Sequence, residues 1–153
     1  MITQYTRYAL KALLHLAGGP RDQTQPVTEI AEKANIPRKF LEAILADLKR
    51  RGFVISTRGK LGGYRLARPP EQITFGDVVR QLEGPIAMFP CASKTAYQRC
   101  VDCADEAACQ LRHVMIAARE QMASVLDEAT LASARQGARV AGQRVTDEVS
   151  GAV

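Results

Sequence analysis

The chain has no tryptophan, few other aromatic residues and only two histidines. Phenylalanine and tyrosine together make up 5% of its 153 residues. A base-stacking surface or an aromatic-lined pocket would therefore have few residues to draw on. With only His15 and His113 there is little general-base material, and no Ser-His-Asp grouping, metalloprotease helix or nucleotide-binding fingerprint is visible. We therefore do not expect an enzyme.

Long apolar runs and a signal peptide are also missing from the sequence. No stretch approaches the roughly 18 uninterrupted apolar residues that a bilayer crossing requires, and the N-terminal segment lacks the pattern of a secretory signal. Hydrophobic residues make up 46% and charged residues 24%, which is typical of one globular domain with an appendage. We expect a cytoplasmic protein without a membrane partner.

Positive charge is concentrated in one segment of the chain. Residues 33–68 contain ten Lys or Arg and two acidic residues, a net charge of +8, whereas the whole chain carries +5 and its remainder therefore −3. A basic segment of this kind indicates a polyanionic partner, and double-stranded DNA is the obvious one. A solvated basic face is the alternative when charge alone is considered.

Apolar periodicity predicts three helices in the first 51 residues, over about 3–17, 28–34 and 37–51. Thr28 offers an N-cap hydroxyl for the second helix, and Pro37 suits the start of the third. The third helix has an apolar stripe of Phe40, Leu41, Ile44, Leu45 and Leu48. Because so tight a turn separates the last two helices, they form a helix-turn-helix whose second helix can enter the major groove.

The segment after the third helix predicts a wing. Two short strands, 53–56 and 64–66, flank the glycine-rich basic turn 58–63. Glycines let the backbone approach a phosphate or a minor groove closely. The expected fold is therefore mainly α with a small β wing: a winged helix-turn-helix domain over residues 1–84. Its expected DNA-binding residues are Thr28, Arg38, Lys39, Glu42, Arg50, Arg51, Arg58, Lys60, Gly62, Gly63 and Tyr64.

Three further segments follow the winged domain, whose last helix is predicted from Thr74, at its N-cap, to Gly84. Residues 85–110 show no apolar period and are expected to be a loop. Residues 111–132 predict a long dimerisation helix, and residues 133–153 a flexible tail. The helix has an apolar seam of Leu111, Met115, Ala118, Met122, Val125 and Ala129, spaced alternately by four and three residues. This spacing favours a homodimer; a helix lying on its own domain is the alternative.

All four cysteines of the chain, Cys91, Cys100, Cys103 and Cys109, lie in the loop 85–110. A disulfide framework does not suit a reducing compartment or a chain with its own core. Zinc sites usually use two short Cys or His pairs, and this loop has one, Cys100 and Cys103. An iron-sulfur cluster tolerates irregular spacing and is favoured over zinc, with free redox thiols as a third reading. The acidic residues Asp102, Asp105 and Glu106 of the loop are candidate oxygen ligands, although acids in an exposed loop are more often simply solvated.

The order of these motifs resembles the Rrf2 family of bacterial transcriptional regulators. The resemblance is carried by IPRKFLEAILADLKRRGFV (36–54) and RGKLGGYRLARPPEQITFGDVVRQLEG (58–84), then by PC, CVDC and CQLRHVM before a long helix. It covers about residues 1–132 and includes the IscR, NsrR and RirA types. It implies a homodimer on a partly palindromic DNA operator, often with an iron-sulfur cluster that alters DNA affinity. The competing class is a small redox or electron-transfer protein that docks an acidic partner.

The resemblance also assigns expectations to single positions. Glu42 matches the recognition-helix glutamate that discriminates operators, and Arg58 matches the wing arginine of the minor groove. Arg38 and Lys39 differ in type from the family, so their base preferences do not transfer.

For the cluster, the resemblance matches Cys91, Cys103 and Cys109 to the family's three thiolates. The positions where relatives supply a fourth ligand hold Arg7 and Arg112, neither of which can ligate, and His113 lies one step away. Cys100 is our first choice to complete the site. Four thiolates suit a 4Fe-4S cluster better than a 2Fe-2S cluster, with zinc as the alternative metal.

Overall fold

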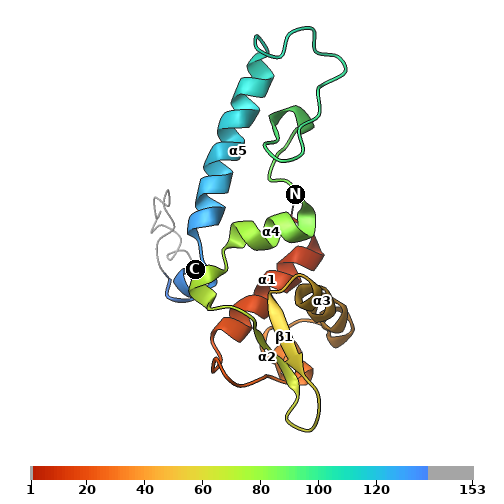
Figure 1. Ribbon diagram of the computed structural model, residues 1–153, viewed down its shortest axis with the longest axis vertical. Helices are drawn as coiled ribbons and strands as arrows, with labels where there is room; N and C mark the ends of the chain where they lie inside the picture. Colours follow the sequence, from red (N-terminus) through yellow and green to blue (C-terminus); the bar gives the residue numbers. More distant parts are fainter. Residues whose placement is uncertain (1, 138–153) are drawn as a thin grey trace, which may run out of the picture.

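The structure is a computed structural model that describes residues 2–137. It is mostly helical with one two-stranded antiparallel sheet, which confirms the predicted fold class (Figure 1). No helix within these residues is both long enough and apolar enough to span a bilayer. The elements in chain order are α1 (Gln4–Ala17), α2 (Val27–Lys33), α3 (Arg38–Arg50), β1 (Val54–Thr57), β2 (Gly63–Leu66), the short η1 (Pro70–Gln72), α4 (Phe75–Glu83), η2 (Pro90–Ala92), α5 (Gln110–Glu128) and α6 (Leu131–Arg135).

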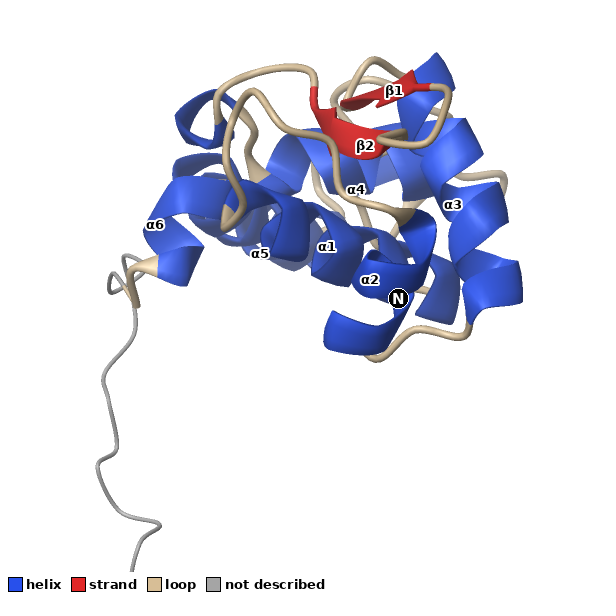
Figure 2. Ribbon diagram, turned by 90° about the horizontal axis from the view of Figure 1, so that it is seen from below, coloured by secondary structure: helices blue, strands red, loops and turns tan. Residues whose placement is uncertain are grey.

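The hydrophobic core lies among the first helices, with the two strands on one side of α1, α2 and α3 (Figure 2). Helix α3 buries one complete stripe, which packs with the apolar side of α1. Burying such a stripe is the main force that holds an amphipathic helix in place. The buried residues of these two helices include Ala9, Ala12, Leu13, Leu16, Leu41, Ile44, Leu45 and Leu48.

Two local predictions in this domain are wrong. Phe40, expected in the buried stripe of α3, is 59% exposed. It lies in the first turn of α3, just before the residues that the helix buries, Leu41, Ile44, Leu45 and Leu48. Thr28 is not the N-cap of α2, because Pro26 takes that position with an extended backbone and the helix starts at Val27. Thr28 lies exposed in the first turn instead.

The wing forms as predicted, and its glycines have a folding role. The strands pair from Val54 opposite Leu66 to Thr57 opposite Gly63. Tyr64 also exchanges two backbone hydrogen bonds with Gln25, of 2.8 and 2.9 Å, so the loop before α2 continues the sheet. A Cβ atom at Gly63 would collide with the Gln25 carbonyl, and one at Gly62 would crowd the Thr57 carbonyl. Small residues are therefore required here by packing alone.

The long C-terminal helix ends earlier than predicted. Helix α5 stops at Glu128, and a new helix, α6, begins at Leu131 under a Thr130 cap. The break exists because the chain turns back onto the winged domain, where Leu131 is completely buried and α6 packs on α1. Ala129, expected in the apolar seam, is buried at this junction instead. The predicted flexible tail falls partly on the ordered α6, and its residues 138–153 lie outside the described part of the chain.

Helix α5 is clamped to α4 at its C-terminal end. Backbone hydrogen bonds run from the Phe75 N–H to the Ala129 carbonyl (2.9 Å) and from the Leu131 N–H to the Ile73 carbonyl (3.0 Å). Arg80 of α4 adds a bidentate ion pair to Asp127, with nitrogen–oxygen distances of 2.5 and 2.7 Å. From this clamp α5 extends away from the winged domain (Figure 1).

We predict that Leu131→Ala lowers the free energy of unfolding by about 2–5 kcal/mol, because it leaves a cavity where α6 meets the core. The measurement is urea denaturation followed by circular dichroism. Leu61→Ala removes the same atoms from a side chain that is 89% exposed at the wing. It should change stability by no more than about 0.5 kcal/mol. Equal effects of the two variants would show that α6 is not docked.

We also predict a loss of stability in acid that depends on Asp127. Hydrogen bonds from Arg80 hold the pKa of Asp127 below its ordinary value, against partial burial, which raises it. A lowered pKa in the folded state means that the stabilising contribution is complete above the unfolded value of about 3.9 and is lost as the pH falls through the folded value. Unfolding measured from pH 6 downwards should therefore show a shallower acid decline for Asp127→Asn. Identical pH profiles for the variant and the parent chain would contradict this assignment.

Candidate DNA interface and cysteine cavity

The exposed side of α3 carries the residues expected to face DNA bases. Arg38, Lys39 and Glu42 are all exposed near the start of the helix. Arg38 donates through Nε to Glu42 Oε1 at 2.9 Å, an ion pair one helical turn long. This contact leaves the two terminal nitrogens of the guanidinium free to donate. The structure thus brings two of the three expected base-reading residues into direct contact.

The wing presents its basic residues at the tip of the hairpin. Arg58 and Lys60 are exposed, and neither makes an ion pair within residues 2–137. Lys49 of α3 donates to Ser56 of β1 at 2.7 Å, which ties the recognition helix to the wing. Sequence analysis counted Lys49 only as charge and missed this positioning role, which no sequence signal reveals.

Arg50 and Arg51, both expected to bind DNA, differ in their surroundings. Both donate to Asp47, at 3.0 and 3.1 Å, and despite partial burial they help hold the pKa of that carboxyl below its ordinary value. Arg51 also donates to the Gln81 carbonyl of α4, so it joins α3 to α4. The side chain of Arg50 is 76% exposed. Arg50 is therefore the freer of the two to contact a ligand.

The remaining residues expected to contact DNA are Thr28, Gly62, Gly63 and Tyr64, and the last three are only partly exposed. Thr28 is exposed on α2, whereas Tyr64 is partly buried and packs against the hydrophobic core. Gly62 and Gly63 lie at the end of the wing turn, close to the backbone of Thr57 and Gln25. Packing alone therefore explains why these two positions hold glycine, whether or not they contact DNA.

All four cysteines line one cavity of about 450 Å³. The cavity lies where the loop 89–109 meets the first turn of α5. This N-terminal end of α5 is far from the clamp at its other end (Figure 1). Its other lining residues include Phe89, Glu106 and Arg112. Cys100 is exposed, while Cys91, Cys103 and Cys109 are half-buried. The structure therefore brings together every cysteine that the sequence singled out.

Two of the cysteines are held directly by α5. Cys109 is the N-cap of the helix, and its Sγ accepts a hydrogen bond from the Arg112 N–H at 3.4 Å. The Arg112 side chain donates to the Cys91 carbonyl at 3.0 Å. One face of α5 thus positions both the first and the last cysteine of the cavity.

Arg119 strengthens the same connection. It is only 8% exposed and donates to the Ala92 carbonyl at 2.6 Å, next to Cys91. Arg112 and Arg119 lie seven residues apart and so occupy one face of the helix. Sequence analysis missed both as supports of the cysteine turn, although their spacing in a predicted helix was a usable signal.

Cys103 is crowded by other groups of the cavity, and Glu106 has an unsatisfied oxygen among the described residues. Burial raises the pKa of Cys103, and the neighbouring Cys109, Cys100 and Glu106 raise it further. Glu106 accepts a hydrogen bond from the Tyr97 hydroxyl at Oε2, at 2.5 Å. Its other oxygen, Oε1, is buried without a hydrogen-bond partner in the described part of the chain. The cavity therefore combines crowded thiols with an unsatisfied carboxylate oxygen.

The donors of the cavity do not converge on a single point. Within residues 2–137 no three His, Cys, Asp or Glu side chains are close enough together to hold one metal ion. Arg7, Arg112 and His113 occupy the other positions considered for a fourth ligand. Of these three, only Arg112 lines the cavity.

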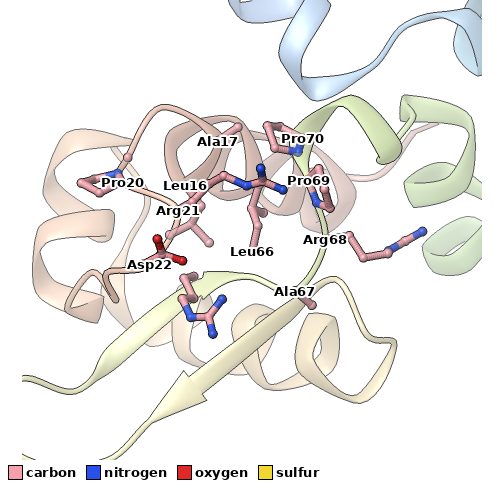
Figure 3. Close-up of a pocket in the computed structure, with 12 residues that line it drawn as sticks. Leu16, Ala17, Pro20, Arg21, Asp22, Leu66, Ala67, Arg68, Pro69 and Pro70 are labelled. Carbon is pink, nitrogen blue, oxygen red and sulfur yellow. The ribbon is translucent and has the colours of Figure 1, made fainter.

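A second, smaller cavity of about 190 Å³ lies in the winged domain (Figure 3). The end of α1, the loop that follows it and the segment after β2 form its walls, with Arg21, Asp22 and Arg68 as its charged residues, together with Arg65. No cysteine or histidine lines it. The cysteines singled out as candidate metal ligands therefore line the other cavity, at the start of α5.

Comparison with known proteins agrees with this geometry. The family model Rrf2, described as an iron-dependent transcriptional regulator, matches residues 2–136. A curated Rrf2-like, helix-turn-helix-type transcriptional regulator of Rhodobacter capsulatus is 47% identical over 134 residues, covering 86% of this chain and 89% of that protein.

Two solved structures are also similar. CymR, the global cysteine regulator of B. subtilis, has a TM-score of 0.75 and 31% identity, and covers 91% of this chain and 98% of its own. IscR of T. potens has a TM-score of 0.68 and 28% identity, and covers 91% of this chain and 88% of its own. The members of the family are transcriptional regulators and not enzymes. The chain belongs to the Rrf2 family of winged-helix transcriptional regulators.

Proposed function

We propose that this regulator acts in the cytoplasm as a homodimer on a double-stranded DNA operator, and that an iron-sulfur cluster in the cysteine cavity controls its operator affinity. One observation carries this proposal: α5 holds the cysteine cavity at its N-terminal end and is clamped to the winged domain at its C-terminal end. A chemical change at the cysteines is therefore connected by one rigid helix to the DNA-reading module.

On the DNA side, affinity and base choice reside on different residues. Arg50, Arg58 and Lys60 are exposed cations suited to phosphates and the minor groove, and their contribution falls with salt. Arg38 and Glu42 are suited to base edges in the major groove, where Arg reads guanine and a carboxylate accepts from cytosine.

The proposed dimer follows from the exposed apolar side chains of α5. Three residues of the predicted seam, Leu111, Met122 and Val125, are between 37% and 57% exposed, and Val114, which lies outside that seam, is 59% exposed. Pairing two copies of this helix would bury these side chains. It would also present two recognition helices to half-sites that lie about 34–36 Å apart.

The four thiols that line one space of about 450 Å³ support an iron-sulfur cluster in the cavity. A single zinc ion would need its sulfur ligands about 3.8 Å apart on a 2.3 Å tetrahedron, and three such ligands do not converge here. Cys91, Cys100, Cys103 and Cys109 are the proposed ligands, and four thiolates suit the 4Fe-4S type.

The bound cluster would supply sulfide-bridged iron that joins the cysteine segments and reacts with oxidants or nitric oxide. The chain's own residues transmit the result. Cys109 caps α5 and Arg112 ties the Cys91 turn to its first turns, so release of these cysteines changes how the helix begins. The Arg80–Asp127 pair fixes the other end, so the change is passed to the winged domain.

We predict that Arg58→Ala weakens DNA binding about tenfold and lowers the slope of log K against log salt concentration by about 1, because one cation no longer neutralises the backbone. Fluorescence anisotropy with a duplex from upstream of the chain's own gene measures both quantities. Lys94→Ala removes the same charge from the cysteine segment, distant from the wing, and should leave both unchanged.

Glu42→Ala provides a contrast in the same assay. It should keep the salt slope and instead relax the preference among base pairs at one operator position. Binding that is unaffected by either Arg58→Ala or Glu42→Ala would rule out the proposed interface.

We predict that anaerobically purified protein absorbs in the visible and contains about four iron and four sulfide per chain. Cys91→Ala, Cys103→Ala and Cys109→Ala should each abolish the absorption, because each removes a ligand that the fold positions. Elemental analysis and absorption spectroscopy measure these quantities, and anisotropy with and without the cluster measures its effect on operator affinity.

Arg58→Ala serves as the control for cluster loading, since it should retain iron while losing DNA affinity. A colourless protein with one zinc per chain would overturn the cluster, and an operator affinity that is the same with and without the cluster would overturn its control of DNA binding. Either result would leave the DNA-binding assignment intact.

A further inference from the structure

We infer that Phe40 reads a thymine of the operator, by packing its ring against the C5-methyl group of that base in the major groove. This inference rests on the proposed function, in which α3 is the helix that reads DNA bases. It adds an apolar contact to the polar readers Arg38 and Glu42. It also gives a role to a large apolar side chain that the free chain leaves in water.

The exposure of Phe40 is the first observation. Phe40 is 59% exposed, although burial of a phenylalanine ring is favourable. Phe53 is buried in the hydrophobic core, Phe75 packs against that core, and Phe89 is 38% exposed. The chain has four phenylalanines, so Phe40 is the most exposed of them, and it lies on the DNA-reading helix.

The place of Phe40 along α3 is the second observation. It is the third residue of the helix, which begins at Arg38. Every residue from Pro37 to Phe40 is exposed, so the start of α3 stands clear of the hydrophobic core. In helix-turn-helix proteins the N-terminal residues of the second helix contact base edges. Phe40 therefore lies in the part of α3 that would enter the major groove.

The place of Phe40 around α3 is the third observation. Arg38 and Glu42 form their ion pair on one flank of the exposed side of the helix. Phe40 lies about 160° around the helix axis from Glu42, on the other flank, with Lys39 between them. Its neighbour one turn along is Ala43, which is exposed and small, so a base has room beside the ring.

The chemistry of the major groove selects thymine as the base. Among the four bases, only thymine presents a methyl group in that groove, and the other groups that distinguish the bases are hydrogen-bond donors and acceptors. A phenylalanine ring carries no amide, hydroxyl or charge, so packing it against those groups would remove their water and leave them unpaired. The thymine methyl group has no such cost.

The proposed dimer does not account for the exposed ring. Helix α3 packs with α1, α2 and β1, whereas α5 packs on α4 and η2 and extends away from the winged domain (Figure 1). The exposed apolar side chains of α5 therefore belong to a different surface from Phe40. DNA is the partner that would cover this ring.

The test combines Phe40→Ala with replacement of thymine by deoxyuridine, which removes the methyl group and keeps the base pair. Fluorescence anisotropy measures the affinity of the full chain for the duplex from upstream of its own gene, with thymines replaced one at a time. Replacement of the contacted thymine should weaken binding by the parent chain about fourfold, the value of one buried methyl group. Phe40→Ala should lose at least as much on the unmodified duplex and nothing further on the substituted one.

Two further variants serve as controls. Phe40→Leu keeps an apolar side chain and should keep most of the sensitivity to deoxyuridine. Glu42→Ala removes a reader on the other flank of α3, so it should retain the fourfold effect of deoxyuridine that Phe40→Ala loses. Because Phe40 is exposed, both of its variants should unfold at the same temperature as the parent chain, as measured by circular dichroism.

Three outcomes would overturn the inference. The parent chain could bind every substituted duplex as tightly as the unmodified one, which would exclude a methyl contact. Phe40→Ala could lose affinity and stay as sensitive to deoxyuridine as the parent chain, which would place the ring against the sugar–phosphate backbone. Phe40→Ala could also bind every duplex as the parent chain does. Failure of the proposed function is distinct, because the parent chain would then bind the operator no better than an unrelated duplex.

Discussion

The contact between the end of α5 and the start of α4 is the constraint on which the rest of the structure depends. Two backbone hydrogen bonds across Thr74 and Thr130, the Arg80–Asp127 pair and the buried Leu131 act together there. Gly76 is part of the arrangement, because a Cβ atom at that position would collide with the Asp127 carboxylate. Without this junction the end of α5 would lose its main contacts with α4, and the proposed function would lose the connection between the cysteines and the winged domain.

Local patterns in the sequence were sufficient for most of the fold. The buried stripe of α3, the Thr74 cap and the paired strands of the wing all follow from residue spacing and turn chemistry, which act over a few residues. The errors arose where a distant contact decides the outcome. The predicted helix over 111–132 had no internal stop signal strong enough to end it at Glu128. Its end is set by the docking of Leu131 on α1, which is a tertiary interaction.

The candidate site also has a part that the sequence predicted and a part that it did not. Cysteine count and order singled out the four cysteines that line the cavity, all of them in the loop before α5. The supports were not predicted. Arg112 and Arg119 bind carbonyls more than twenty residues away in the chain, and the unsatisfied oxygen of Glu106 is a property of packing. Composition names candidate ligands, whereas only the fold shows how each is held.

The difference in how the cysteines are held has a consequence for the proposed sensing. A ligand fixed by two or more protein contacts keeps its place when the bound group changes, so it can pull the helix to which it belongs. Cys109, as the cap of α5, is in that position, and Cys91 follows through Arg112. Cys100 is exposed and has no such support, so its release alone moves nothing that touches α5. Under the proposed function, chemistry that begins at Cys100 would therefore reach the winged domain only by going on to free a cysteine that α5 holds.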